Sequence, residues 1–344
     1  MPDLSQTPMT LLLLGLLLAA GVILAGGLRM TGLADRIADR TGLGEALVGG
    51  ALLGAATSLS GVVVSLSAAL DGRASLAFSN SVGGIAAQTA FLALADLLWR
   101  KANLEHAAAE LANLFQSALL LLLLALPVLA YGGPDISVLA VHPVSLVLPV
   151  LYAMGLIGTH RSRQAPMWHP VKTHETREDT DEEGGQDDTP TWRLFLAFGL
   201  LMAVMGLCGL AIARLAGELT DRTGVSASLV GALLTAVITS LPELVTTLAA
   251  VRRGALQLAL GGIIGGNTFD TLFLTLSDIG YREGSLYHAI GPGDMFWLGT
   301  GMAMTGILLL GQLYRERQGP AGIGLESVGM LGLYAGAVAL AAFG

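Results

Sequence analysis

Charged residues are scarce in this chain of 344 residues, where Asp, Glu, Lys and Arg make up 13%; an average soluble domain carries about 25%. Aromatic residues contribute 6%, and the single cysteine is Cys208. One cysteine excludes a disulfide scaffold or a thiolate metal site. The net charge of -8 argues against nucleic acid as a partner. With 53% hydrophobic residues and a mean hydropathy of +0.68, the composition excludes an ordinary soluble fold.

The apolar residues gather in ten runs that contain no charged residue, and nine of these runs are at least 18 residues long. Such a length lets a helix cross a bilayer at about 1.5 Å per residue. The sequence therefore predicts an all-α integral membrane protein with about ten transmembrane helices in contact with the lipid bilayer. The eighth run becomes a full span only if it continues through Asp270 to about Thr275. The runs are 4–28, 46–70, 74–95, 111–134, 136–160, 194–213, 223–242, 254–269, 295–314 and 327–344.

The basic residues are distributed unevenly among the connections between these spans. Fourteen of the 18 Lys and Arg residues fall in the odd-numbered connections. Basic residues concentrate in the cytoplasmic loops of membrane proteins. We therefore expect a multi-pass protein of the cell (inner) membrane with the odd-numbered connections in the cytoplasm and both termini outside.

The longest connection, 160–193, holds eight acidic residues between Glu175 and Asp188. Its composition predicts a solvated, flexible cytoplasmic linker. A regulatory cation-binding role is the alternative, but the acids lack the spacing of an EF-hand. This loop divides the chain into a first five-helix unit, 1–159, and a second, 194–344. Because each unit has an odd number of spans, the two have opposite orientations in the membrane.

The two units are related by an internal sequence repeat. Residues 57–96 align without gaps to 239–278 at a constant offset of 182, and sixteen of the 40 aligned positions are identical. Inverted repeats of this kind are typical of secondary transporters, whose binding site lies where the repeats meet. The alignment also pairs Asp96 with Asp278 at the ends of spans, where we expect contact with water or a helix terminus.

Glu243 and Asp270 are the only acids that lie well inside predicted spans. A carboxylate at the centre of a bilayer costs at least about 2.5–3.5 kcal/mol on insertion scales, so such a residue usually faces a partner or a water-filled pathway. The alternative is a buried acid satisfied by hydroxyl groups or by a salt bridge. However, no Lys, Arg or His occurs at a comparable depth. The two acids are therefore predicted to bind cations.

The residues around both acids suit a dehydrated cation. Pro242 removes a backbone donor and disrupts the helix, which frees carbonyl groups for an ion. Thr239 and Ser240 precede it by about one turn, although hydroxyl groups in membrane helices often bond back to the preceding turn instead. Asn267 and Asp270 are three residues apart and share a helix face. These oxygen donors are hard ligands that suit calcium better than a soft metal.

With T-S-L-P-E-L and G-G-N-T-F-D-T-L, the second repeat resembles the second alpha-repeat of the cation/calcium exchanger superfamily, which comprises sodium/calcium exchangers and their proton- and potassium-coupled relatives. The resemblance implies ten spans in two inverted repeats around a long cytoplasmic loop. It also implies that Thr239, Ser240, Glu243 and Asp270 are cation ligands.

The first repeat diverges from that family. Thr57, Ser58 and Asn80 keep the expected residues, but Ser60-Gly61 stands where the family has Pro-Glu. Half of the acidic site is therefore missing. We expect Gly61 to leave a space opposite Glu243 that water or a larger ion occupies.

A second departure concerns Gln88, which with Gly84 and Ile85 replaces the usual serine and asparagines of the family. We expect Gln88 to offer a neutral oxygen opposite Asp270. The residues predicted to surround the metal ion are Thr57, Ser58, Asn80, Gln88, Thr239, Ser240, Glu243, Asn267 and Asp270.

Two carboxylates balance one divalent cation, so the sequence predicts a calcium/cation antiporter that exchanges Ca²⁺ for H⁺ or Na⁺ by alternating access. The missing first-repeat glutamate removes a site for a coupling monovalent ion and favours protons. Transport of another cation and a non-transporting ion sensor or scaffold are the alternatives. We do not expect an enzyme, because none of the six histidines lies in the repeat motifs to pair with a nucleophile.

Overall fold

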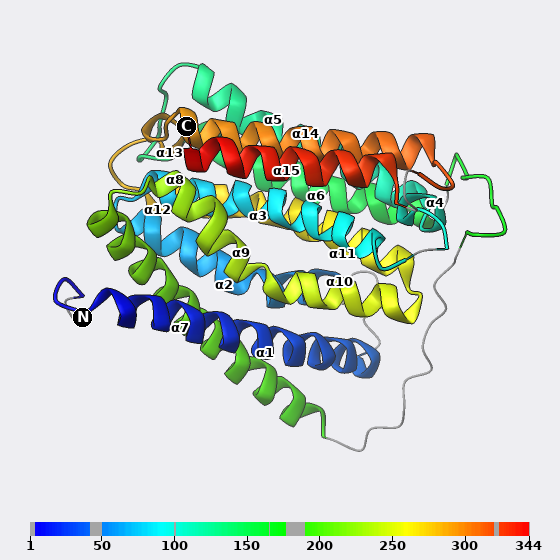
Figure 1. The fold of residues 1–344 in the computed structure, drawn as a ribbon, viewed down its shortest axis with the longest axis horizontal. Helices are drawn as coiled ribbons and strands as arrows, with labels where there is room; N and C mark the ends of the chain where they lie inside the picture. Colours follow the sequence, from blue (N-terminus) through cyan, green and yellow to red (C-terminus); the bar gives the residue numbers. More distant parts are fainter. Residues whose placement is uncertain are drawn as a thin grey trace.

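The computed structural model describes residues 4–41, 50–99, 101–164, 166–176, 190–319 and 323–343. These ranges are helical apart from connections and one isolated β-bridge between Val138 and Val141. The predicted all-α fold is confirmed (Figure 1). The first half contains α1 (Met9–Thr41), α2 (Gly50–Leu70), α3 (Ala74–Asp96), the short α4 (Leu104–Ala107), α5 (Leu111–Gly132) and α6 (Pro143–Gln164).

The second half repeats this order with more interruptions. It contains α7 (Thr191–Thr223), α8 (Ala227–Leu229), the π-helix η2 (Val230–Thr235), α9 (Ala236–Thr239), α10 (Leu241–Arg253), α11 (Leu256–Asp270), α12 (Leu272–Gly280), the short α13 (Leu286–Ala289), α14 (Pro292–Tyr314) and α15 (Leu325–Phe343).

The offset of 182 residues extends far beyond the aligned motif. The bounds of α1 and α7, and those of α4 and α13, differ by this offset at both ends. In Figure 1, α1 and α7 pack along each other and run in opposite directions, and the N and C termini lie at the same end of the bundle. The two halves are therefore inverted copies of one helical unit without a net insertion.

Six helices of the described residues, or seven if α8–α10 counts as one bent span, are long and apolar enough by themselves to cross a membrane. Helix α3 falls short because it carries polar residues, whereas α11 and α12 are each too short. Helix α3 is buried along nearly its whole length and contains Ser79, Asn80, Gln88 and Thr89. Such groups are tolerated because protein, rather than lipid, surrounds them.

The outer helices present leucines outward. Leu17 on α1, Leu129 on α5 and Leu207 on α7 are 70%, 66% and 67% exposed. Apolar side chains so exposed along long apolar helices fit a surface that faces lipid. The polar core and the apolar periphery together describe a multi-pass membrane protein.

The connection after α6 is partly packed against the bundle. Arg315 donates to the backbone oxygen of Val171 at 2.7 Å, His106 contacts the hydroxyl of Thr173 at 2.9 Å, and Arg317 pairs with Glu175. The segment 166–176 is therefore held by α4 and by the end of α14, unlike the freely solvated linker expected over 160–193. Most of the predicted acidic stretch falls within 177–189, outside the described residues.

Candidate cation site

The seventh span is bent by 48° between α9 and α10, at Ser240. Pro242 lies in the first turn of α10, where its missing N–H and its ring prevent a continuous helix. Glu243 follows in the same turn. The helix N-terminus directs backbone N–H groups and positive potential toward this region. In the first repeat, Ser60-Gly61 replaces Pro242-Glu243, and α2 continues through this position.

Asp270 lies at a second interruption, between α11 and α12. Its backbone oxygen accepts a hydrogen bond from the Ser81 hydroxyl at 2.8 Å, which supplies a partner for a carbonyl at the helix end. In the first repeat, Gln88 occupies the equivalent position within the continuous helix α3. Both acids therefore come from interrupted helices of one half and face unbroken helices of the other.

The two acids line one small cavity of about 10 Å³, the space open to the centre of a water-sized sphere. That volume is about the room required by one water molecule. Glu243 is 6% exposed and Asp270 is 2% exposed. Seven of the nine predicted site residues line the cavity, and its full lining is Ser58, Gly61, Asn80, Gly84, Gln88, Thr239, Ser240, Glu243, Asp270 and Phe273.

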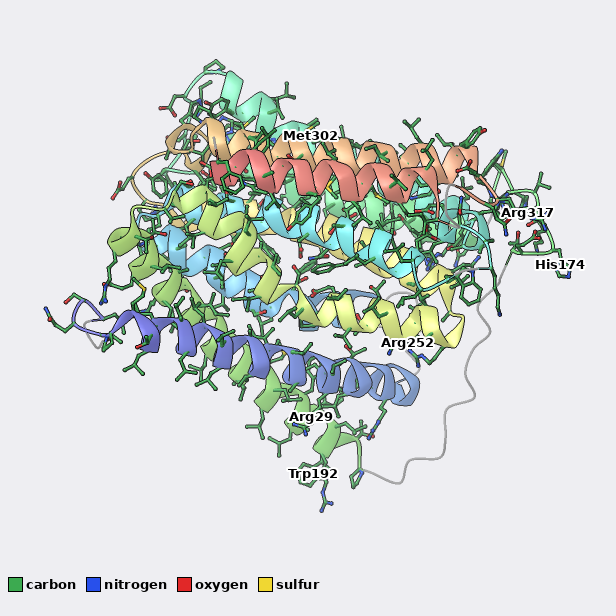
Figure 2. All side chains as sticks on the ribbon, in the orientation of Figure 1. Arg29, His174, Trp192, Arg252, Met302 and Arg317 are labelled. Atoms are coloured by element: carbon green, nitrogen blue, oxygen red, sulfur yellow. The ribbon has the colours of Figure 1, made fainter. Side chains whose placement is uncertain are left out.

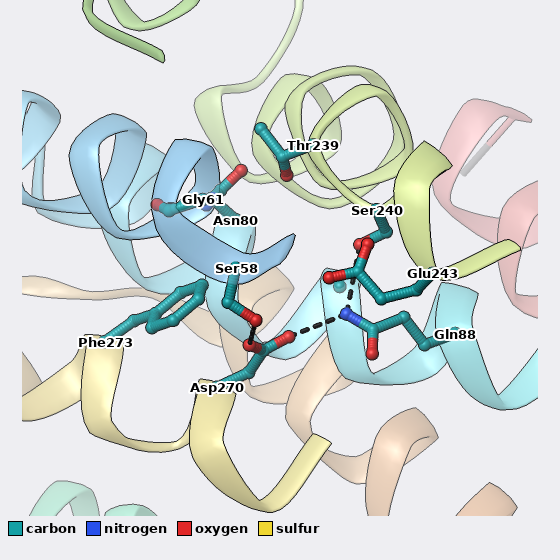
Figure 3. Close-up of a pocket in the computed structure, with 10 residues that line it drawn as sticks. Ser58, Gly61, Asn80, Gln88, Thr239, Ser240, Glu243, Asp270 and Phe273 are labelled. Atoms are coloured by element: carbon teal, nitrogen blue, oxygen red, sulfur yellow. Dashed lines mark hydrogen bonds between the residues drawn. The ribbon is translucent and has the colours of Figure 1, made fainter. Parts of the chain in front are cut away.

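Two donors hold the Asp270 carboxylate in place (Figure 3). The Ser58 hydroxyl donates to Oδ1 at 2.8 Å, and the Gln88 amide nitrogen donates to Oδ2 at 2.7 Å. The same nitrogen donates to the Ser240 hydroxyl at 3.1 Å. The expectation of a neutral oxygen opposite Asp270 is therefore wrong for this structure. An ionised carboxylate attracts an N–H donor, and the buried Gln88 oxygen has no partner among the residues that the structure describes.

Glu243 is held less completely. The Thr57 hydroxyl is close enough to donate to its carboxylate, but Oε2 is buried and has no partner among the described residues. An ionised oxygen left without a donor is costly in a buried site. A cation or a proton would satisfy it.

The expected space beside Gly61 is narrowed by an aromatic ring. A Cβ atom at this position would lie 2.7 Å from Cε2 of Phe273, which shows that the Phe273 ring already packs against the glycine. The room left between Gly61 and Glu243 is the small cavity that both residues line, which suits about one water molecule rather than a larger ion. Phe273 is not among the predicted site residues, although the repeat aligns it with an identical residue, Phe91.

Asn80 and Thr239 line the cavity but also hold the surrounding helices together. The Asn80 amide donates to the Gly61 carbonyl at 3.2 Å, and its oxygen accepts from Thr235 at 2.6 Å. Thr239 bonds back to the Thr235 carbonyl at 2.9 Å, the alternative expected for a hydroxyl in a membrane helix. Its oxygen retains lone-pair capacity on the cavity side.

Asn267 lies outside the cavity lining. Its amide donates to the Thr89 hydroxyl at 3.0 Å, whereas its oxygen is buried and has no partner in the described part of the chain. Asn267 therefore links α11 to α3 one turn away from Asp270. Helix spacing alone placed it on the same face as Asp270, but the neighbouring helix determines what it contacts.

Two inverted halves that enclose a buried pair of carboxylates define a multi-pass membrane protein built like a secondary transporter. Residues 11–159 and 193–343 match the family model described as sodium/calcium exchanger protein. The chain therefore belongs to the sodium/calcium exchanger family, and it is an exchanger-type membrane protein rather than an enzyme.

Curated relatives include the inner membrane protein YrbG of Escherichia coli (strain K12), which is 27% identical over 277 residues, 75% of this chain and 78% of YrbG. The putative antiporter CaxA of Alkalimonas amylolytica is 36% identical over 84 residues, which cover 24% of this chain and 26% of CaxA.

Among solved structures, the sodium-calcium exchanger NCX_Mj superposes with a TM-score of 0.61 at 18% identity, covering 96% of this chain and 99% of that one. The H⁺/Ca²⁺ exchanger CAX superposes with a TM-score of 0.66 at 13% identity, covering 96% of this chain and 85% of that one. These similarities establish the fold: ten membrane helices in two inverted repeats.

Proposed function

We propose that this protein is a secondary active antiporter that exchanges Ca²⁺ for protons at Glu243 and Asp270, with Na⁺ as the other candidate coupling ion. The observation that carries the proposal is the pair of buried carboxylates on one ion-sized cavity (Figure 3). The proposal assigns the ligand oxygens to these two acids and to hydroxyl groups around them. Ser58, Thr239 and Ser240 are the hydroxyl candidates.

The charge of the site supports antiport. Two ionised carboxylates without a counter-ion cannot be buried cheaply. One Ca²⁺ ion or two protons neutralise them, so either cargo permits the site to close during passage across the membrane. The empty, doubly charged site is the state that resists closure. Movement in one direction is therefore coupled to movement of the other cargo in the opposite direction.

The volume of the site supports protons over sodium as the counter-substrate. A cavity with room for about one water-sized sphere suits one dehydrated Ca²⁺ ion. Two Na⁺ ions would need two such places to supply the same charge. Protons bind to the carboxylate oxygens themselves and need no additional volume. Among similar proteins, CAX is a H⁺/Ca²⁺ exchanger and NCX_Mj a sodium-calcium exchanger by name.

We also propose the orientation expected from the basic residues, with both termini outside and the connection 160–193 in the cytoplasm. Arg252, Arg317 and His174 lie toward the end of the bundle away from the termini (Figures 1 and 2). The proposed location is the inner membrane, where the relative YrbG is found by its name. The proposed repeat units remain 1–159 and 194–344.

Calcium flux into proteoliposomes, under an imposed proton or sodium gradient, tests the proposal. We expect Ca²⁺ uptake driven by an outward proton gradient, with proton movement in the opposite direction. Glu243→Gln should abolish exchange because it removes one of the two charges that Ca²⁺ balances. Glu283→Gln is the matched control, since Glu283 is exposed in the loop after α12 and should leave flux unchanged.

The possible outcomes separate the alternatives. Unchanged flux in Glu243→Gln would refute the assigned site, and flux driven by sodium but not by protons would refute the proton coupling. Binding of Ca²⁺ by calorimetry without flux under either gradient would indicate an ion sensor or scaffold. A competition series with other cations identifies a different cargo if Ca²⁺ neither binds nor moves.

A further inference from the structure

Three acidic side chains meet far from the cation site, where α3 ends and α15 begins. Asp96 closes α3, Glu105 belongs to the short helix α4, and Glu326 lies in the first turn of α15. Asp96 ties the two later elements together: one carboxylate oxygen accepts from the backbone N–H of Leu104 at 2.8 Å and the other from that of Gly324 at 3.0 Å.

The other half of the protein has the same frame, meaning an aspartate that accepts from two backbone N–H groups, but it lacks counterparts of Glu105 and Glu326. Asp278, the repeat partner of Asp96, accepts from the backbone N–H groups of Leu286 and His142 at 2.8 and 2.7 Å. At the offset of 182, Tyr287 takes the place of Glu105 and Val144 the place of Glu326. The frame therefore forms without this pair of acids, so a purely architectural need does not explain them.

Glu105 is completely buried, and neither of its carboxylate oxygens has a donor among the described residues. Its carboxyl group faces that of Glu326, close enough for one hydrogen bond. Oε1 of Glu326 also lacks a donor. Two carboxylates cannot bond to each other, because both only accept. A single proton between them supplies the missing donor.

The other charged groups near this pair do not replace that proton. The negative charge of Asp96 repels the charged forms of both Glu105 and Glu326, and that of Glu316 repels the charged form of Glu326. Arg315 donates instead to the backbone oxygens of Val171 and His106, and His106 bonds to the Arg315 carbonyl and to Thr173. Lys101 lies over the Trp99 ring. Burial, followed by Asp96 and Glu326, raises the pKa of Glu105 well above its usual range.

We propose that Glu105 and Glu326 form a second proton-binding site, separate from the cation site, which fastens α4 to α15 while the two acids share a proton. Loss of the proton leaves two buried charges facing each other and loosens this contact. Helix α4 carries His106, which holds Thr173 in the segment 166–176. The site thus makes the packing of the central connection dependent on pH.

The direction of the pH dependence follows from the raised pKa of Glu105. The folded protein binds this proton more tightly than the unfolded chain, in which a glutamate has a pKa of about 4.3. The stabilisation is complete below that value and is lost as the pH rises through the pKa of the folded state. Alkaline conditions should therefore weaken the fold at this end of the bundle.

Infrared spectroscopy and thermal unfolding of the purified full chain test the proposal without any transport measurement, so failure here is distinguishable from failure of the proposed antiport. At about pH 6, the spectrum of the wild type minus that of Glu105→Gln should show the carbonyl band of a buried protonated carboxyl group, because any signal from protonated Glu243 and Asp270 is common to both proteins and cancels. The Gln amide donates to Glu326 at every pH. The unfolding temperature of the variant should therefore fall less than that of the wild type between about pH 6 and 9.

Glu110→Gln is the matched control, because Glu110 pairs with Arg163 at the surface and should keep both the band and the wild-type pH slope. If Glu105→Gln does not fold, Glu326→Gln serves instead, since its amide donates to the Glu105 carboxylate and also removes the shared proton. A difference spectrum without this band, or a pH slope of the Gln variants equal to that of the wild type, would overturn the proposal.

Discussion

The Gln88→Glu substitution provides a sharp test of the cation site. The Gln88 amide nitrogen donates to the Asp270 carboxylate at 2.7 Å. The substitution removes this donor and puts a third negative charge into the cavity with little change of shape. Hydrogen bonds to charged groups contribute about 1.5–3 kcal/mol, so losing this stabilisation of the empty site should tighten Ca²⁺ binding by roughly ten- to 150-fold.

Calorimetric titration with Ca²⁺ in sodium-free buffer at about pH 9 measures this effect, because alkaline conditions limit neutralisation of the new acid by protons. Gln116→Glu is the matched control: it makes the same substitution on α5, outside the cavity lining, and should leave the affinity unchanged. Equal or weaker Ca²⁺ binding by a folded Gln88→Glu protein would refute the inferred role of the Gln88 amide.

Two further substitutions distinguish residues that shape the cation site from residues that stabilise the fold. Phe273→Ala should open the space beside Gly61, lower stability by about 3–5 kcal/mol and improve binding of larger divalent cations relative to Ca²⁺; Phe91→Ala, its repeat counterpart, should destabilise without this change in selectivity. Asp278→Asn should weaken bonds to Leu286, His142 and Ser145, at about 1.5–3 kcal/mol for each bond lost. Its unfolding temperature should fall while Ca²⁺ affinity stays the same, and a folded variant that fails to bind Ca²⁺ would contradict the structural role of Asp278.

The membrane class, the inverted repeat and the two central acids could be predicted because they depend on local properties of the chain. Hydropathy and charge mark each span whatever its neighbours are, and the offset of 182 residues relates the halves before either is folded. Pro242 predicted the interruption at α10, since a proline disrupts a helix wherever it occurs within one. Seven of the nine predicted site residues line the same cavity for these reasons.

Contacts between distant residues were decided only by the tertiary structure. Gln88 presents nitrogen rather than oxygen to Asp270 because the amide turns to meet the charge beside it. The Phe273 ring narrows the space that the missing side chain of Gly61 suggested. Glu105 belongs to a connection and Glu326 to the start of a distant helix, so no local pattern pairs them. Both side chains are buried, and three of their four carboxylate oxygens have no donor in the part of the chain that the structure describes, which is the physical reason for the proposed shared proton.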